Sequence, residues 1–446
     1  MDASTNDTRE IFGWLMYDWA NSAFVTTVVT TLLGPYILSL AALSPSPLEI
    51  GNWHIQPAAI FPAAVSLSVL LQVFLLPVLG TIADYTRLKK SMLLTFAYVG
   101  AGCTCLFFFT RSNMPLIGTV GAIVIAGVLV VIANLCFGAS LVFYNAFLPE
   151  IASPDRRDAV SSQGFAMGYL GGGLLLLLNL LMLGLMKNQA LAARLSLASA
   201  GVWWLVFTWL FPQKRLRVRE PARHLPDERG LLRQSLSRIL TTMHDMRTHY
   251  TGTLKYLIAY LIYNDGIQTV IVVATSFAAG ELRVKQSHLL LFVLMIQAVA
   301  FFGALLFGRL AGWIGARRSI MISLAIWSGA VIYAYLLLQD ERQLFALGFL
   351  VAIVLGGSQA LSRSLFAQMI PAKHEAEYFA FYEISDRGTS WVGPLVFAAA
   401  VQITGSQRSA IVSLIAFFLI GLVLLSRVDV RRAMEDAGND PTQVVL

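Results

Sequence analysis

The chain has 446 residues, of which 57% are hydrophobic and 13% charged, and its formal net charge is +7. Soluble domains carry roughly 25% charged residues, so about half of the usual charge is missing. Apolar runs of about 20 residues, each long enough to cross a bilayer as a helix, recur along the whole sequence. This composition excludes an ordinary soluble domain and indicates a polytopic membrane protein.

The apolar runs predict twelve transmembrane helices in an all-α membrane protein. They are expected near residues 12–41, 57–82, 91–110, 117–146, 162–186, 191–212, 254–279, 289–312, 319–338, 343–370, 378–404 and 408–427. The first run exceeds the roughly 7–15 residues of a signal-peptide core, so we expect no cleavable signal. The predicted domains are an N-terminal six-helix bundle (1–212), a basic cytoplasmic linker (213–253), and a C-terminal six-helix bundle with a short cytoplasmic tail (254–446).

The first predicted helix carries a carboxylate and an amide on one face, because Asp18 and Asn21 are one helical turn apart. A charge at mid-bilayer costs ~2.5–3.5 kcal/mol, so a charged residue within a span is a candidate for function. Both side chains are therefore expected to face a central cavity. Alternatively, the helix begins near Trp19 and Asp18 is its N-cap at the membrane interface.

The second half of the chain repeats the first. The segment GTIADYTRLKK (80–90) follows the second span, and GRLAGWIGARR (308–318) follows the eighth at a constant offset of 228 residues. Asp18 in the first span is answered by Asp265 in the seventh. Two six-helix halves of this kind are typical of secondary transporters.

The linker contains one amphipathic pattern, in the segment ERGLLRQSLSRILTTMHDM (228–246). Its apolar residues share one helical face and are Leu232, Leu236, Ile239, Leu240 and Met243. A helix lying on the inner membrane surface fits this pattern, and so does an ordinary linker helix.

Charged residues lie within three later spans. Asp265 lies about eleven residues into its span, or ~16 Å at 1.5 Å per residue, which is near the midplane. Glu383 and Arg387 have the spacing of a helical ion pair with the acid first. Asp386 points elsewhere, and Arg363 is its expected partner. Arg363 and Arg387 are also candidates for holding a substrate carboxylate, because a guanidinium can bind one with two hydrogen bonds.

Uncharged residues add weaker signals. Asn145 and Gln268 are polar candidates for the site, although an interhelical hydrogen bond would explain each of them. Glycines at four-residue spacing in the fifth span (Gly164, Gly168, Gly172) favour close helix packing. Gly388, Gly393 and Pro394 favour a kink in the eleventh span. The cysteines and histidines show neither metal-ligand spacing nor a nucleophile–base pair, so we expect no cofactor, no metal and no enzymatic activity.

Basic residues predict the orientation of the chain in the membrane. The loops on the side of the termini contain 22 Lys and Arg residues, and the loops on the other side contain seven. The positive-inside rule therefore places both termini in the cytoplasm. Since topology accounts for the positive charge, no nucleic-acid partner is expected.

Several motifs resemble those of a known family. The segment from Gly80 resembles the loop signature of the major facilitator superfamily, although Arg87 and Gly312 depart from the usual pattern. The segments YDWANSAF (17–24), YNAFLPEIA (144–152), GYLGGG (168–173) and YEISDRGTSWVGP (382–394) are similar to the vacuole-effluxer branch of that superfamily. Its fungal members are associated with export of amino acids from the vacuole.

The resemblance implies two bundles that rock about a central site, and a gate at the cytoplasmic helix ends. Gly80, Asp84, Arg87 and Lys90 would form the gate in the first half, and Arg317 with Arg318 would be their second copy. In this reading Asp84 and the basic residues bridge neighbouring helix ends only while the cytoplasmic side is closed. Alternatively, the basic residues only determine topology.

The sequence thus predicts a secondary active transporter of the major facilitator fold in the cytoplasmic membrane. Its expected partners are membrane lipid, a small polar organic solute and a coupling proton or cation. An amino acid is the favoured solute, with efflux as one open direction. The alternatives are transport of another cargo, such as a drug-like cation or a sugar, and a membrane receptor or scaffold that does not transport.

Overall fold

The computed structural model describes residues 5–43, 48–50, 53–112, 114, 118–220, 231–387 and 392–446. The first half contains α1 (Thr8–Ala23), the π-helix η1 (Phe24–Leu32), α2 (Leu33–Ala42), the paired strands β1 (Leu48–Ile50) and β2 (Trp53–Ile55), η2 (Pro57–Ala59), α3 (Ile60–Tyr85), α4 (Lys89–Leu106), η3 (Phe107–Phe109), α5 (Gly118–Ala146), α6 (Leu148–Ile151), η4 (Pro154–Arg156), α7 (Arg157–Leu185), α8 (Gln189–Leu210) and α9 (Pro212–Arg215).

The second half begins with α10, which lies in the predicted linker. Its elements are α10 (Leu231–Thr248), α11 (Thr251–Gly280), α12 (Gln286–Ile314), α13 (Ala316–Leu336), α14 (Glu341–Gln368), α15 (Glu375–Arg387), α16 (Val392–Thr404), α17 (Gln407–Ile411), α18 (Ser413–Ser426), α19 (Val430–Asp436) and η6 (Pro441–Gln443).

The predicted all-α membrane fold is confirmed. Within the described residues, eleven helical segments are long and apolar enough to cross a membrane. Within the predicted eleventh span the structure describes α15 and α16, and residues 388–391 between them lie outside the described residues. Together these segments give the twelve expected crossings.

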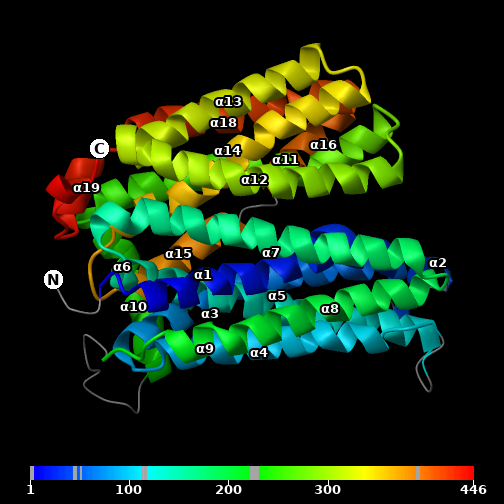
Figure 1. Ribbon diagram of the computed structural model, residues 1–446, viewed down its shortest axis with the longest axis horizontal. Coiled ribbons are helices and arrows are strands. Elements are labelled where there is room, and N and C mark those ends of the chain that lie inside the picture. Colours follow the sequence, from blue (N-terminus) through cyan, green and yellow to red (C-terminus); the bar gives the residue numbers. More distant parts are fainter. Residues whose placement is uncertain are drawn as a thin grey trace.

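The helices form two bundles that lie side by side (Figure 1). One contains α1 to α8, and the other contains α11 to α14, α16 and α18. Helix α7 packs against α12 and α14 of the other bundle, and α15 packs against α3 and α5. Helix α15 therefore belongs to the second half of the chain but contacts the first bundle.

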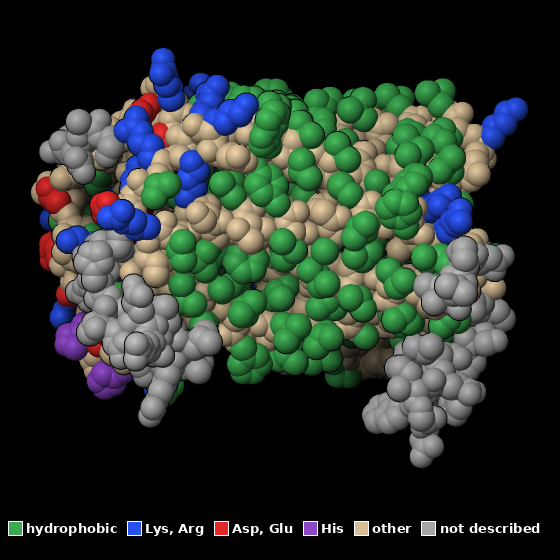
Figure 2. All heavy atoms as spheres, turned by 90° about the horizontal axis from the view of Figure 1, so that it is seen from below, with side chains coloured by type: hydrophobic (Ala, Val, Ile, Leu, Met, Phe, Trp, Pro, Cys, Tyr) green, Lys and Arg blue, Asp and Glu red, His purple; other side chains and the backbone are tan. Residues whose placement is uncertain are grey.

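Both termini lie at one end of the molecule, which we call the inner end (Figure 1). Lys and Arg side chains gather at this end, and a broad hydrophobic belt covers the middle of the face in Figure 2. This distribution of charge is the one expected for a protein that spans a bilayer.

The start of α1 decides between the two interpretations of Asp18. The N-cap of α1 is Asp7, whose carboxylate accepts a hydrogen bond from the backbone N–H of Arg9. That bond holds the pKa of Asp7 below its usual value. Since α1 runs from Thr8 to Ala23, Asp18 lies well inside it. The interpretation of Asp18 as a helix cap is wrong.

The predicted packing role of the glycine stripe in α7 is confirmed. A Cβ atom added to Gly164 would lie 2.6 Å from Asp18 Oδ2 of α1. Added at Gly168 or Gly172, it would lie 2.6 Å from the hydroxyl oxygen of Ser22 or Thr26. The glycines therefore let α7 approach the polar face of α1 and the start of η1.

Helix α10 packs on the protein. It contacts α3 of the first bundle and α11 of the second, with Met246 fully buried and Ile239 and Met243 against the core. Leu240 is exposed, and the side chains of Leu232 and Leu236 lie outside the described residues. The described part of the apolar face thus covers the inner ends of helices from both bundles.

Candidate functional site

An ion pair joins the two bundles near the middle of α1. Arg363 of α14 donates from both terminal nitrogens to Asp18 Oδ2, at 3.2 Å each. The hydroxyl of Tyr144 in α5 donates to the same oxygen at 2.6 Å. Asp18 is 7% exposed and Arg363 2%. Both charges are therefore removed from water and depend on each other for compensation.

The remaining surroundings of Arg363 belong to the first bundle. Its Nε donates to Ser161 Oγ, and its Nη2 donates to the Ser161 carbonyl, at 2.9 Å each. The rings of Trp14, Tyr144 and Phe165 lie 4.7, 5.4 and 4.3 Å from the guanidinium carbon. Arg363 is thus inserted from the second half into an aromatic, hydrogen-bonding pocket of the first.

Asn145 links this ion pair to a second one. Its Oδ1 accepts from Arg363 Nη1 at 3.3 Å, and its Nδ2 donates to Glu383 Oε1 at 2.7 Å. Arg387 donates from Nε to Glu383 Oε2 at 3.2 Å, so the predicted helical ion pair is confirmed. The hydrogen bonds therefore run from α1 through α14 and α5 to α15.

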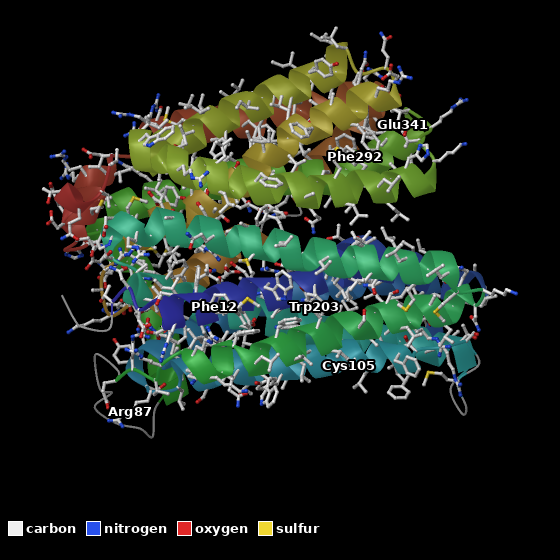
Figure 3. All side chains as sticks on the ribbon, in the orientation of Figure 1. Phe12, Arg87, Cys105, Trp203, Phe292 and Glu341 are labelled. Atoms are coloured by element: carbon white, nitrogen blue, oxygen red, sulfur yellow. The ribbon has the colours of Figure 1, made fainter. Side chains whose placement is uncertain are left out.

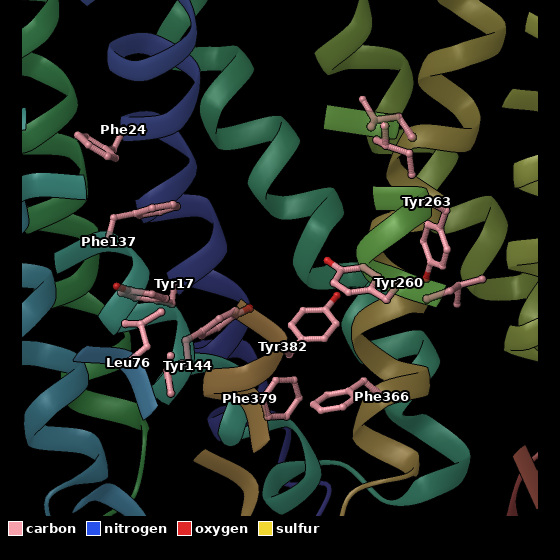
Figure 4. Close-up of a cluster of buried hydrophobic side chains, with 14 of the residues drawn as sticks. Tyr17, Phe24, Leu76, Phe137, Tyr144, Tyr260, Tyr263, Phe366, Phe379 and Tyr382 are labelled. Carbon is pink, nitrogen blue, oxygen red and sulfur yellow. The ribbon is translucent and has the colours of Figure 1, made fainter. Parts of the chain in front are cut away.

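Asp386 is not paired with Arg363, and that expectation was wrong. Its Oδ1 accepts from the Tyr260 hydroxyl at 2.6 Å and from Asn264 Nδ2 at 2.9 Å, both on α11. The ring of Tyr260 stacks on Tyr382 with centroids 4.4 Å apart. Figure 4 shows this aromatic cluster beside the Tyr17–Tyr144 cluster of the first bundle.

Asp265 is bonded within its own half of the chain, whereas Asp18 is paired across the two halves. Its Oδ2 accepts from the backbone N–H of Gly393 at 2.8 Å, at the start of α16. It therefore ties α16 to α11. Gln268 is half-buried on the same helix. Asn21 is buried beyond Asp18, and its Nδ2 has no partner among the described residues.

The inner ends of α3 and α15 meet at Gly80 and Asp84. Asp84 accepts from the backbone N–H groups of Ala376 and Glu377, at 3.0 and 2.8 Å. These groups lie in the first turn of α15, where a helix favours a negative charge. A Cβ added to Gly80 would lie 2.4 Å from the Ala376 carbonyl oxygen.

The basic residue of this contact is Lys89, which the sequence did not single out. Its Nζ lies 2.7 Å from Glu150, 3.6 Å from Asp84 and 3.9 Å from Glu375. Arg87 instead pairs with Glu220 at 2.5 Å, on the side of the first bundle that faces away from the second (Figure 3). The run of basic residues predicted the correct segment for this contact. Which of its side chains faces α15 depends on the residue at which α4 begins, and that residue is Lys89.

The second basic pair lies elsewhere. Arg317 donates to the carbonyls of Val428 and Ser426, at 2.9 Å each, within the second half. Arg318 is exposed, and Lys90 is only partly buried at the start of α4. The predicted gating role of these three side chains remains a prediction, because the contact between α3 and α15 is made by others.

The π-helix η1 is a feature that the sequence did not predict. The backbone N–H of Leu33 donates to the Val28 carbonyl five residues earlier, as in a π-helix. Thr26 in this segment accepts a hydrogen bond from Gln297 of α12 at 2.7 Å. The Thr- and Val-rich run gives no local signal for the wider turn.

The two bundles and the polar contacts between them define the major facilitator fold. Solved structures support this fold: the fucose transporter FucP in its outward conformation aligns over 93% of this chain and 97% of its own, with TM-score 0.63 and 13% identity. An outward-facing bacterial ferroportin homologue aligns over 94% and 98%, with TM-score 0.66 and 13% identity.

Sequence comparison identifies the family. Residues 6–438 match the family described as "Vacuole effluxer Atg22 like", and the chain belongs to this family. It is 32% identical over 425 residues to the MFS-type transporter YxiO of Bacillus subtilis, covering 94% of each chain. It is 26% identical to Autophagy-related protein 22-1 of Penicillium rubens, covering 98% of this chain and 92% of the relative. The protein is therefore a membrane transporter and not an enzyme.

Proposed function

We propose that the protein is a secondary active transporter that moves a zwitterionic solute, an amino acid in the first instance, across the cytoplasmic membrane by alternating access. The observation that carries this proposal is the Asp18–Arg363 ion pair between the bundles. Alternating access requires contacts that hold one end closed and can be exchanged for contacts with a substrate.

The inner end has the contacts of a closed state. Asp84 and Lys89 of the first bundle engage the start of α15. Arg157 of α7 donates to the Ala367 carbonyl and to Gln368 Oε1, both at 3.1 Å. By contrast, the outer helix α16 packs mainly against α11, α17 and α18 of its own half. This asymmetry favours a state that is closed inside and accessible from outside.

The charges favour a zwitterion as cargo. Removing one partner from a buried ion pair costs about 3–5 kcal/mol, because the other charge stays uncompensated. A solute with an ammonium and a carboxylate supplies a counter-charge to both Asp18 and Arg363, so it can separate them without that cost. A cation would leave Arg363 unpaired, and a sugar would leave both residues without a counter-charge.

Orientation and location follow from charge. The inner end carries the basic residues, which favours a cytoplasmic position for both termini. The family includes vacuolar relatives by description, and this chain is proposed for the cytoplasmic membrane because of its relation to the bacterial YxiO. A proton or cation is the proposed coupling partner.

Counterflow in proteoliposomes tests the proposal. Vesicles loaded with one amino acid from a panel should accumulate labelled external amino acid. An α-amino acid should compete, whereas its amide and its decarboxylated amine should compete at least about tenfold less well, since each lacks one charge. Counterflow of a sugar or a simple cation, with none for any zwitterion, would refute the cargo. Vesicles that contain the Arg363→Met variant, which lacks the guanidinium, serve as the control for counterflow by the parent protein.

A further inference from the structure

We propose that Asn145 is a positioning residue that links proton binding at Glu383 to the Asp18–Arg363 contact between the bundles. The inference rests on the proposed alternating access and specifies its coupling ion as a proton. Asn145 is 3% exposed and touches both ion pairs, although it carries no charge itself.

The amide of Asn145 can have only one orientation in this state. A guanidinium has hydrogen-bond donors only, and an ionised carboxylate has acceptors only. The amide oxygen must therefore face Arg363 and the amide nitrogen must face Glu383, as observed. Leucine at this position would satisfy neither neighbour, and aspartate would place a second carboxylate against Glu383.

Each oxygen of the Glu383 carboxylate accepts a hydrogen bond from a described neighbour. Asn145 donates to Oε1 and Arg387 donates to Oε2, and the residue is 2% exposed. A proton can bind a remaining lone pair, but it removes the charge that makes both of these hydrogen bonds strong, so the weaker of the two partners is released more easily. The bond from Arg387 is the charge-assisted one between ions, so the neutral amide is the weaker competitor.

The charges around Glu383 favour the uptake of one proton. The described members of the cluster are the acids Asp18, Glu383 and Asp386 and the bases Arg363 and Arg387. Three acids against two bases leave one negative charge in excess. Tyr260 and Asn264 of α11, both neutral, face Asp386. The charged residues Asp84 of α3 and Lys89 of α4 lie at the start of α15.

The effect of protonating Glu383 reaches Arg363 through the side-chain amide of Asn145, whose nitrogen contacts Glu383 and whose oxygen contacts Arg363. When Asn145 releases protonated Glu383, its side chain turns and its oxygen leaves Arg363. Arg363 then loses one of the contacts that hold it in the first bundle, and the Asp18–Arg363 pair is easier to separate. Proton binding from outside thus favours opening at the inner end. No bond other than O–H forms, and the proton is released when Glu383 ionises again.

The test measures opening directly, in full-length protein in lipid nanodiscs. Cys103, Cys105 and Cys136 are replaced by serine, and spin labels are attached at Arg156→Cys and Arg427→Cys. Both positions are exposed at the inner end, one in each half. Distances between the labels are recorded from mildly acidic to mildly alkaline pH, with and without a transported amino acid. The label pair reports opening without requiring transport.

We expect acid to lengthen the distance, with the open-to-closed ratio changing by up to about tenfold per pH unit for one linked proton. Asn145→Leu should reduce this to about twofold or less, and Glu383→Gln should remove it. The matched control is Asn134→Leu, on the same helix and also buried, because the side chain of Asn134 donates to Ser68 and its backbone carbonyl accepts from Gln72, both within the first bundle. Its pH response should equal that of the parent protein.

A sign test separates a positioning role from a structural one. In Asn145→Asp two carboxylates face each other, which favours a bound proton, so the response should begin at higher pH. If Asn145→Leu only offsets the distance at every pH and keeps the slope, Asn145 is structural and the proposal is overturned. A parent protein that responds to substrate but not to pH also overturns it and leaves the proposed function standing. A parent that responds to neither refutes both.

Discussion

Gly80→Ala is the sharpest test of the inner gate. Gly80 of α3 lies against the first turn of α15, and an added Cβ would be 2.4 Å from the Ala376 carbonyl oxygen, 2.9 Å from its carbon and 3.1 Å from Ala380 Cβ. The obstruction is backbone, which cannot turn aside as a flexible side chain can. Ordinary contact begins near 3.4 Å, so α3 and α15 must separate by about 1 Å.

That displacement removes the hydrogen bonds of Asp84. Its bonds to the Ala376 and Glu377 N–H groups are 3.0 and 2.8 Å long, and a shift of about 1 Å takes both beyond bonding distance. Hydrogen bonds to a charged group contribute about 1.5–3 kcal/mol each, so the closed state loses about 3 kcal/mol or more. The open-to-closed ratio at the inner end should therefore rise at least about hundredfold.

The spin-labelled pair at Arg156 and Arg427 measures this ratio. Gly102→Ala is the neutral control, because a Cβ there meets nothing within 4 Å. Gly201→Ala is the destabilising control, because its Cβ would lie 2.6 Å from the Ala101 carbonyl oxygen inside one bundle. Gly201→Ala should lower the unfolding temperature without changing the label distance. Gly80→Ala should lengthen the label distance without lowering the unfolding temperature. Equal label distances in Gly80→Ala and Gly102→Ala would refute the gate.

Three further predictions follow from the same contacts. Asp84→Ala should lower counterflow about tenfold or more while membrane insertion, measured by size-exclusion profile, is retained, and full transport would remove its gating role. Arg363→Lys should reduce amino-acid counterflow more strongly than Arg387→Lys, because lysine lacks the planar fork and, of the two, only Arg363 is ion-paired with a residue of the first bundle. Equal transport by the two variants would speak against carboxylate binding. Asp265→Asn should preserve the pH profile of uptake, since an amide oxygen can still accept from Gly393, whereas Asp18→Asn should abolish concentrative uptake. The reverse order would point to Asp265, and not Glu383, as the coupling residue.

The sequence predicted most of the fold because span length and charge placement are local properties. The twelve apolar runs and the repeated loop both followed from composition within short windows, whereas the predicted kink falls at residues 388–391, outside the described residues. The π-helix η1 did not, because a run of Thr and Val fits both helical types. The choice of Lys89 over Lys90 was also out of reach, since it depends on the residue at which α4 begins.

The sequence predicted which residues belong to the candidate site, but it did not predict which of them pair with each other. Asp18 and Arg363 stand out because a charge within an apolar span is costly. Their pairing joins residues 345 positions apart, and it depends on how α7 lets α1 and α14 approach. Local spacing could therefore find the Glu383–Arg387 pair but assigned Arg363 to Asp386.

The energetics of the Asp18–Arg363 pair suit a contact that must break in every cycle. A buried ion pair contributes little net stability, because desolvation offsets most of the attraction. Loss of one partner alone is costly, so the pair resists separation until something replaces both partners. A zwitterion bound between the bundles would do so, and withdrawal of Asn145 would lower the remaining barrier. The carboxylate in the first helix is thus placed where substrate and proton act on the same bond.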